Sequence, residues 1–289
     1  MITWQLLLAC YVLLNTATYL LQRKLGQKLA KRRRLVSGFF MLGIHYPIGL
    51  LVAAYSSPHL AIGWLNIALL VVGSWVFPLI NILTIQASKT VDADHFTILS
   101  NLTPIITIVA ATLLLHESLH GHQIVAAVLI LASAFLITLP RLRQSGRSKT
   151  TGISLALLVF LLAGVATVYE RWMLTRVDIG AYLVFGWGAQ SLWMALVAWP
   201  ERKHLKTLKN RKSFVTILSF SLVSSLKGVC FIAALRLSGN ASVFSAFTGF
   251  TAVLVVPAAY IFLHERRWLL PKLAIGSVAT SGIIILNLK

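Results

Sequence analysis

The stretch Phe220–Leu237, FSLVSSLKGVCFIAALRL, decides the class of protein to which this chain belongs. Its residues are apolar or small, apart from Lys227 in the middle and Arg236 near the end. A helix crosses the hydrocarbon of a membrane with about 20 apolar residues, and about 17 are enough. The stretch therefore predicts a membrane-spanning helix that carries one ammonium group inside it.

The whole chain has the composition of a membrane protein. Of its 289 residues, 58% are hydrophobic and only 11% are charged, whereas about a quarter of the residues in a soluble domain are charged. The formal net charge of +19 invites a nucleic-acid interpretation, but the basic residues stand in short loops between apolar segments. We therefore exclude nucleic acid as a partner and expect a lipid bilayer around the chain.

Ten apolar segments predict an all-α integral membrane protein with ten transmembrane helices. Strands of a membrane barrel would alternate with a period of two, and these segments do not. The first segment indicates an uncleaved anchor, because its start, MITWQ, lacks positive charge and the basic run follows it. The predicted ranges are roughly 3–22, 35–56, 60–85, 95–115, 123–139, 152–173, 180–199, 214–236, 241–263 and 271–288.

Lysines and arginines are distributed unevenly between the two sides of the predicted bundle. Loops after odd-numbered segments hold twenty-one of the 26, most of them in 23–34 and 202–212. Loops after even-numbered segments, with both termini, hold four. Because basic loops stay in the cytoplasm, we predict that both termini lie outside and that the membrane is the plasma (inner) membrane. Adhesion of the same basic loops to anionic lipid is compatible with this arrangement.

The two halves of the chain share an internal repeat. The tripeptide LHE ends the fourth segment at 115–117 and the ninth at 263–265, an offset of 148 residues. The same offset relates QR at 22–23 to ER at 170–171. Each half then has five segments, and because five is odd the second half must cross the membrane in the opposite orientation. Inverted repeats of this kind build many secondary transporters, with the substrate site near the midplane between the halves.

The layout resembles the EamA-type ten-helix members of the drug/metabolite transporter superfamily. Each five-helix repeat of that family has a small and polar fourth helix, often with a proline, a short turn, and a fifth helix rich in small residues. The chain has ILSNLTPIITIVAATLLLHESL at 98–119 before IVAAVLILASAFLITL at 124–139. It repeats the theme with FSAFTGFTAVLVVPAAYIFLHERRW at 244–268 before LAIGSVATSGIIIL at 273–286.

The resemblance has two departures and several implications. His116 and His264 stand where glycine is usual, and family members commonly keep both termini in the cytoplasm, whereas the charges here place them outside. The resemblance implies a first repeat at 1–140, a basic linker at 141–151 and a second repeat at 152–289. It further implies a secondary transporter of small polar metabolites that works by alternating access, without enzymatic activity.

Neither a cofactor nor an oligomeric partner is expected from the sequence. The chain lacks the G-x-x-x-x-G-K-[ST] loop that binds nucleotide phosphates, so nothing suggests ATP hydrolysis. No histidine, cysteine and carboxylate cluster has metal-binding spacing, and HESLHGH at 116–122 falls in a turn. Because ten helices can close a cavity by themselves, we expect a monomer.

Lys227 is the first candidate for a substrate-binding residue. It lies nine residues from Arg236, which at about 1.5 Å per residue is roughly 13 Å deep. Ionisable groups at such depth are costly and usually face the bundle interior or a wet cavity. Lys227 therefore indicates either an anchor for a solute with a carboxylate or phosphate, or a group that charges and discharges during transport. The alternative is a brace paired with carbonyls or with a carboxylate.

Several neutral polar residues also lie deep in the apolar segments. Together they can replace water around a polar solute, although each one can instead form a hydrogen bond between helices. His45 has a third interpretation, the relay of protons. These candidates are Asn15, His45, Asn81, Asn101, Gln190 and Ser224. Pro104 and Pro78 are predicted to kink their helices, because proline removes a backbone donor.

The chain has seven carboxylates, and none lies in the middle of an apolar segment. The sequence therefore does not favour a carrier with a buried carboxylate relay. Glu170 is the deepest, near the end of the sixth segment. Asp92 and Asp94 precede the fourth segment, where they suit either a helix N-terminus or a gate at the cavity mouth.

Two other functions stay open at this point. A flippase for a lipid-linked substrate belongs to the same class and needs a lateral opening. A membrane scaffold without transport belongs to another class, and both the cost of Lys227 in the membrane and the lack of a soluble domain weigh against it.

Overall fold

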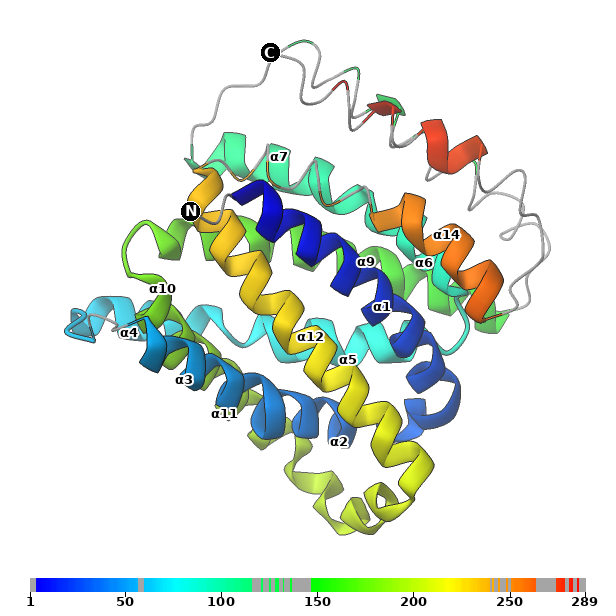
Figure 1. Cartoon of the computed structure of the whole chain (residues 1–289), viewed down its shortest axis with the longest axis horizontal. Coiled ribbons are helices and arrows are strands. Elements are labelled where there is room, and N and C mark those ends of the chain that lie inside the picture. Colours follow the sequence, from blue (N-terminus) through cyan, green and yellow to red (C-terminus); the bar gives the residue numbers. More distant parts are fainter. Residues whose placement is uncertain are drawn as a thin grey trace.

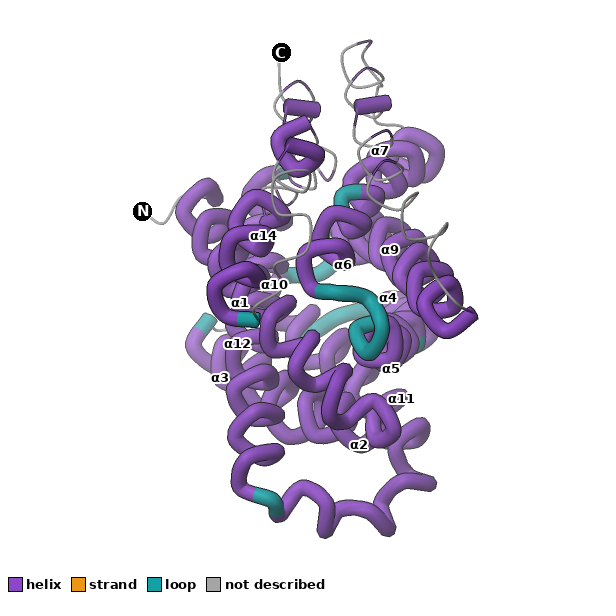
Figure 2. Tube along the Cα trace, turned by 90° about the vertical axis from the view of Figure 1, so that its right-hand side faces the viewer, coloured by secondary structure: helices purple, strands orange, loops and turns teal. Residues whose placement is uncertain are grey.

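The computed structural model describes residues 4–56, 60–115, 147–239 and 251–263, with scattered residues between and after these ranges. All regular structure in these ranges is helical, as Figures 1 and 2 show. Within the described residues, six segments are long and apolar enough to cross a membrane: Trp4–Tyr55, Trp64–Ala87, His95–Leu115, Thr151–Leu174, Ile179–His204 and Ser213–Ser238. The first has 52 residues and contains both the first and the second predicted ranges.

Part of the predicted layout lies outside the described residues. More than half of the fifth and tenth predicted segments, 123–139 and 271–288, falls there, as do most of the two LHE turns. The ninth segment is described mainly through α14, Thr251–Phe262. A count of ten helices therefore stays a prediction.

The first half of the chain forms four helical runs, most of them built from two or more pieces. The first two runs are α1 (Trp4–Leu29), followed by η1 (Ala30–Arg32), α2 (Arg33–Gly38), the π-helical segment η2 (Phe39–His45) and α3 (Tyr46–Tyr55). The next two runs are α4 (Trp64–Gly73) with α5 (Val76–Ala87), and α6 (Ala93–Ser100) with α7 (Leu102–Leu115).

The second half begins with one long helix and contains a second π-helical segment. The elements are α9 (Arg147–Leu174), α10 (Ile179–Ala181), the π-helical segment η3 (Tyr182–Gly186), α11 (Trp187–Ala198), η4 (Trp199–Lys209), α12 (Arg211–Ser238) and α14. Asp178 starts α10, because its carboxylate accepts a hydrogen bond from the Ala181 N–H at 2.6 Å.

Both predicted kink residues follow an interruption of their helix. Pro78 is the third residue of α5, after the break at 74–75, and Pro104 is the third residue of α7, after Asn101. A proline has no N–H for the carbonyl four residues earlier, and here those carbonyls belong to Ser74 and Ser100. Each helix is therefore interrupted at the point where proline cannot donate this backbone hydrogen bond.

Two groups of three packed helices lie in the described bundle. In one group, α1 packs against α12 and α14. In the other group, α9 packs against α5 and α7. Figure 1 shows α1 and α12 side by side across the molecule. The largest buried cluster surrounds Trp187, Tyr182 and Phe244, which are at most 2% exposed.

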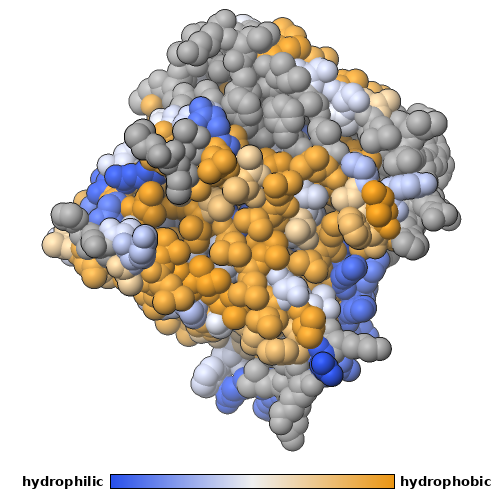
Figure 3. Space-filling model, viewed as in Figure 1, coloured by the Kyte–Doolittle hydropathy of each residue, from blue (hydrophilic) through white to orange (hydrophobic). Residues whose placement is uncertain are grey.

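The outer face of the bundle is apolar, as a lipid-facing surface requires. Leu51 and Leu113 are 72% and 70% exposed, and many other leucines and valines are also turned outward. Figure 3 shows apolar side chains across the middle of one face and hydrophilic ones gathered toward its two ends. Water would make such a surface unfavourable, so lipid is its natural environment.

Basic loops meet at one end of the bundle. The Arg23 guanidinium donates hydrogen bonds to the carbonyls of Ser88 and Lys89 at 2.9 and 3.1 Å. At the same end, the Leu35 N–H donates to the Glu201 carboxylate at 3.2 Å, which joins the start of α2 to η4. Three of the loops predicted to share one side therefore lie together.

The less basic loops meet at the other end of α1 and α12. There Arg171 donates to the carbonyl of Gly239, and Arg236 donates to the carbonyls of Leu174 and Val177. Gly239 has a φ of +73°, a left-handed conformation that glycine adopts without steric cost and that ends α12.

Candidate functional site

A central cavity of about 280 Å³ lies between the long helices α1, α9 and α12. Its walls come from α1, η2, α5, α6, α7, α9, α11 and α12, and they combine aromatic rings with polar groups. The volume is close to the lower end of the 300–1,000 Å³ range that is usual for ligand pockets. All seven residues predicted to bind solute line this one cavity: Lys227, Asn15, Asn101, Asn81, Gln190, His45 and Ser224. Their role in binding stays a prediction.

The α1 wall is one face of a helix. Tyr11, Asn15, Thr18 and Gln22 recur at intervals of three or four residues, and Tyr19 lies four after Asn15, which places all five on the same side. The Asn15 amide donates to the hydroxyl of Thr251 on α14 at 3.2 Å. Asn15 therefore lines the cavity and also forms the interhelical hydrogen bond that was the alternative interpretation of this residue.

Asn101 stands in the break between α6 and α7 and is 1% exposed. Neither its amide nitrogen nor its amide oxygen has a hydrogen-bond partner among the described residues. Burying a polar group without a partner costs about 1–3 kcal/mol. An amide with both atoms unpartnered at the wall of a cavity is therefore poised to bind a water molecule or a polar solute.

Three other polar atoms around the cavity share this condition. Within the described part of the chain, Gln190 Nε2, His45 Nδ1 and Ser224 Oγ are buried and lack a partner. The His45 ring stacks on Trp187 with centroids 3.6 Å apart and an interplanar angle of 23°. The stack holds the imidazole flat against the wall, so its free nitrogen has a defined position.

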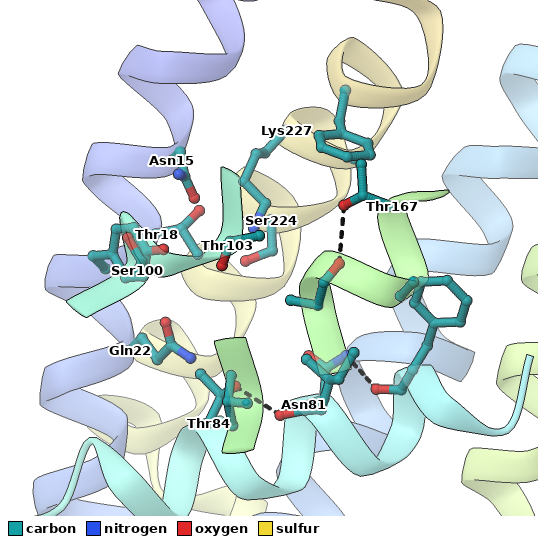
Figure 4. A pocket seen from close by; sticks show the side chains of 18 of the residues that line it. Asn15, Thr18, Gln22, Asn81, Thr84, Ser100, Thr103, Thr167, Ser224 and Lys227 are labelled. Atoms are coloured by element: carbon teal, nitrogen blue, oxygen red, sulfur yellow. Dashed lines mark hydrogen bonds between the residues drawn. The ribbon is translucent and has the colours of Figure 1, made fainter. Parts of the chain in front are cut away.

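Asn81 differs from these groups, since its amide donates to the carbonyl of Phe77 at 3.0 Å. It is half-buried on α5 and keeps its amide oxygen for other contacts. Figure 4 shows Asn81 and Thr84 below Gln22, with Asn15, Ser224 and Lys227 above them, so the polar side chains surround a common space.

Lys227 is half-buried and reaches into the cavity from α12, next to Ser224 (Figure 4). In the part of the chain that the structure describes, it forms neither a hydrogen bond nor an ion pair. The interpretation of Lys227 as a paired brace therefore lacks its partner, and its position in the cavity suits an anchor for charge.

Glu170 is the residue that the sequence interpretation missed. It lines the same cavity, is 7% exposed, and accepts a hydrogen bond from the Tyr182 hydroxyl at 3.0 Å. A carboxylate in the cavity was not expected, because Glu170 stands near the end of its apolar segment. The cavity extends far enough toward that end to include it. The 148-residue offset in the sequence held a signal, since Gln22, which lies 148 residues before Glu170, also lines the cavity.

Asp92 forms an ion pair with Arg23. The two charged groups lie 2.6 Å apart, with 25% of the Asp92 side chain and 11% of the Arg23 side chain exposed. Asp92 directly precedes α6, but its side chain accepts no capping hydrogen bond from that helix. A role as a gate at the cavity mouth stays a prediction. The side chain of Asp94 is outside the described residues.

The other residues singled out in the sequence do not line the cavity. Pro104 and Pro78 lie near it without contributing to its wall, and Pro78 instead borders an apolar groove with Trp75 and Trp193. The HESLHGH turn lies outside the described residues except for single positions. Among the residues that are described, no three of histidine, cysteine, aspartate and glutamate come together as a metal site.

The comparisons with known proteins place a family on the first half of the chain. Residues 2–139 match the EamA-like transporter family. None of the curated proteins matches the sequence. Members of this family are generally transporters rather than enzymes, which agrees with several span-length apolar helices around a polar cavity. The chain is thus a multi-pass membrane protein that carries an EamA-like transporter domain, part of the drug/metabolite transporter superfamily, over residues 2–139.

Proposed function

We propose that the protein is a secondary transporter that moves a small polar metabolite across the membrane by alternating access through the central cavity. The observation that carries this proposal is the set of buried, unpartnered polar atoms on the cavity wall, on Asn101, Gln190, His45 and Ser224. Buried polar groups in native proteins are nearly always hydrogen-bonded. A cluster of exceptions in one cavity is best explained by a polar occupant.

Alternating access requires two similar halves, and we propose that the chain is an inverted pair of five-helix repeats, 1–140 and 152–289, joined by the linker 141–151. The packing supports this division. If α9 corresponds to α1, then α5 corresponds to α12 and α7 to α14. The contacts of α1 with α12 and α14 then match those of α9 with α5 and α7. The family match at 2–139 agrees with the first repeat.

The cavity wall supports the same division residue by residue. An offset of 148 converts each cavity-lining residue of α1 into a cavity-lining residue of α9. The pairs are Tyr11 with Val159, Asn15 with Ala163, Thr18 with Ala166, Tyr19 with Thr167, and Gln22 with Glu170. Five pairs at one offset are what a repeat predicts when the two long helices face each other across a shared site.

The position of the loops supports a sidedness for the bundle. The loops with many basic residues gather at the Arg23 end, and the loops with few gather at the Arg171 end. Because basic loops stay in the cytoplasm, the Arg23 end is cytoplasmic in this proposal and the membrane is the plasma (inner) membrane. A monomer suffices, since one chain supplies every wall of the cavity.

The contacts at the two ends are suited to open in turn. The Arg23–Asp92 pair joins α1 to the turn before α6, and Arg171 with Gly239 joins α9 to the end of α12. Under the 148-residue offset, Arg171 is the counterpart of Arg23, and position 240 that of Asp92. Breaking one contact while the other holds would expose the cavity to one side only.

A ligand-binding screen followed by transport in vesicles tests the proposal. Purified full-length protein in detergent is heated with anionic, neutral and cationic metabolites, because a ligand that binds the folded state raises the melting temperature. Hits are then offered to vesicles containing the protein. Saturable uptake that Lys227→Ala reduces is the expected result. Binding without uptake of any hit would instead support a scaffold, and movement of labelled lipid-linked substrates would support a flippase.

A further inference from the structure

The cavity holds one charge of each sign. Of the described residues that line it, Lys227 on α12 and Glu170 on α9 are the only lysine, arginine, aspartate or glutamate side chains. The positive potential expected from Lys227 alone is therefore opposed by a carboxylate in the same space. A solute that enters must satisfy both.

The two charges do not satisfy each other. Lys227 and Glu170 line the same cavity, but among the described residues they do not form an ion pair with each other. In the described structure, Glu170 accepts only the hydrogen bond from Tyr182, and Lys227 donates none. A charge away from water is costly unless a counter-charge and hydrogen bonds compensate for it.

We propose that the solute is a zwitterion, whose anionic group contacts Lys227 and whose cationic group contacts Glu170. This inference rests on the proposed transport function and specifies the class of substrate. A simple anion would face the Glu170 carboxylate, and a simple cation would face the Lys227 ammonium. A molecule with both groups replaces each missing counter-charge at once, and leaves the cavity neutral with the solute bound.

The rest of the wall suits the body of such a solute. Aromatic rings line the cavity, among them Tyr11, Phe96, Phe160, Phe220 and Phe231. These rings offer an apolar surface of substantial size. The free amide of Asn101 adds a donor and an acceptor on the opposite repeat from the two charges. The two charged side chains thus come from α9 and α12, and the break between α6 and α7 adds an uncharged amide.

Matched sets of ligands test the charge requirement independently of the carbon skeleton. Each set contains a zwitterion, its amine lacking the carboxylate, and its carboxylate lacking the amine. The three sets are alanine, ethylamine and propanoate; leucine, 3-methylbutan-1-amine and 4-methylpentanoate; and phenylalanine, phenethylamine and 3-phenylpropanoate. Their binding to the full-length protein is measured by thermal shift and by titration. In at least one set, the zwitterion should bind about 10- to 100-fold more tightly than either half.

Reciprocal variants identify which charge contacts which group. In Lys227→Met the amine half should bind more tightly than the carboxylate half, because only Glu170 remains. In Glu170→Gln the order should reverse. Lys227→Arg and Glu170→Asp keep the charges, and should keep the wild-type order if the fold is intact. Lys28→Met on the exposed end of α1 and Glu201→Gln in η4 are matched controls outside the cavity, and should also keep it.

The possible failures are distinguishable. If carboxylates bind wild type as tightly as zwitterions and Glu170→Gln leaves the order unchanged, the zwitterion inference is wrong while the transporter stands. The same holds if no set binds but the wider screen finds an anionic, cationic or neutral solute. If neither the sets nor the wider screen gives a ligand or any uptake, the proposed function itself fails.

Discussion

Asn101 and Asn15 offer a matched pair of substitutions, because both asparagines line one cavity but only one holds the bundle together. Asn15 donates a hydrogen bond from α1 to Thr251 on α14. Asn101 is 1% exposed, and both of its amide atoms lack partners in the described structure. Truncation to alanine should therefore affect stability and ligand binding in different proportions at the two positions.

The expected stability changes follow from the contacts. Hydrogen bonds between membrane helices contribute about 0.6 kcal/mol on average and at most about 1.7 kcal/mol. Asn15→Ala should cost about this much, which for a protein of this size corresponds to a fall in Tm of roughly 1–6 °C. Asn101→Ala removes no such bond and relieves two unpartnered atoms, so its Tm should stay within about 1 °C of wild type or rise.

The expected binding changes are opposite in rank. If Asn101 binds the solute, its loss removes hydrogen bonds that form only in the complex, each contributing about 0.5–1.5 kcal/mol. The Kd of the best ligand from the screen should then rise about 2-fold for one weak bond and up to about 150-fold for two strong ones. Thermal unfolding of both variants, with and without ligand, measures all of these quantities in one assay.

One pattern of results would refute the reasoning. If Asn101→Ala lowers the Tm as much as Asn15→Ala does, and the ligand-induced shift is unchanged, Asn101 is part of the internal packing and has partners outside the described residues. The transporter proposal would then lose its strongest single group, although the other unpartnered atoms would remain.

Three further predictions concern the frame around the cavity. Asp92→Asn breaks the 2.6 Å ion pair with α1 and should lower stability by about 1–3 kcal/mol and alter the uptake rate; unchanged unfolding and uptake would show that the pair is dispensable. Gly26→Ala would place a Cβ 2.5 Å from the Ser88 backbone carbon and should lower the free energy of unfolding by about 1–3 kcal/mol. The matched control Gly63→Ala meets no atom within 4 Å and should leave stability unchanged. Equal effects of the two substitutions on thermal unfolding would contradict the close contact at Gly26. Single cysteines at Lys31 and Thr175, in a background without native cysteines, should react with impermeant reagents from opposite sides, Lys31 from the cytoplasm; labelling from one side would overturn the proposed topology.

Much of the candidate site could be predicted from the sequence, because polar residues inside long apolar segments are rare and expensive. This argument selected Asn15, His45 and Gln190, and the structure brings them to the same cavity as Lys227. It could not tell which of these groups would find partners. That depends on which helix lies opposite, as the bond from Asn15 to α14 illustrates.

Glu170, in contrast, could not be recognised as a cavity residue from its position along the chain. It lies four residues before the end of α9, where a carboxylate can reach water easily. The packing of Tyr182 against it, and the length of the cavity along α9, turn it into a buried group. Helices that are apolar on every side carry no strong periodicity, so their sequence does not reveal which face points inward.

The sequence by itself determined that this is a helical membrane protein, where its apolar segments lie, and which polar residues are buried in them. Those properties depend on the composition of each segment and on the free-energy cost of placing its polar groups in hydrocarbon, and neither depends on the other segments. Only the tertiary structure decided that the polar residues share one cavity. It also decided that, among the described residues, Lys227 and Glu170 do not pair with each other and the Asn101 amide has no hydrogen-bond partner. Those properties depend on how each helix is rotated against its neighbours, which is set by side-chain packing between segments far apart in the chain.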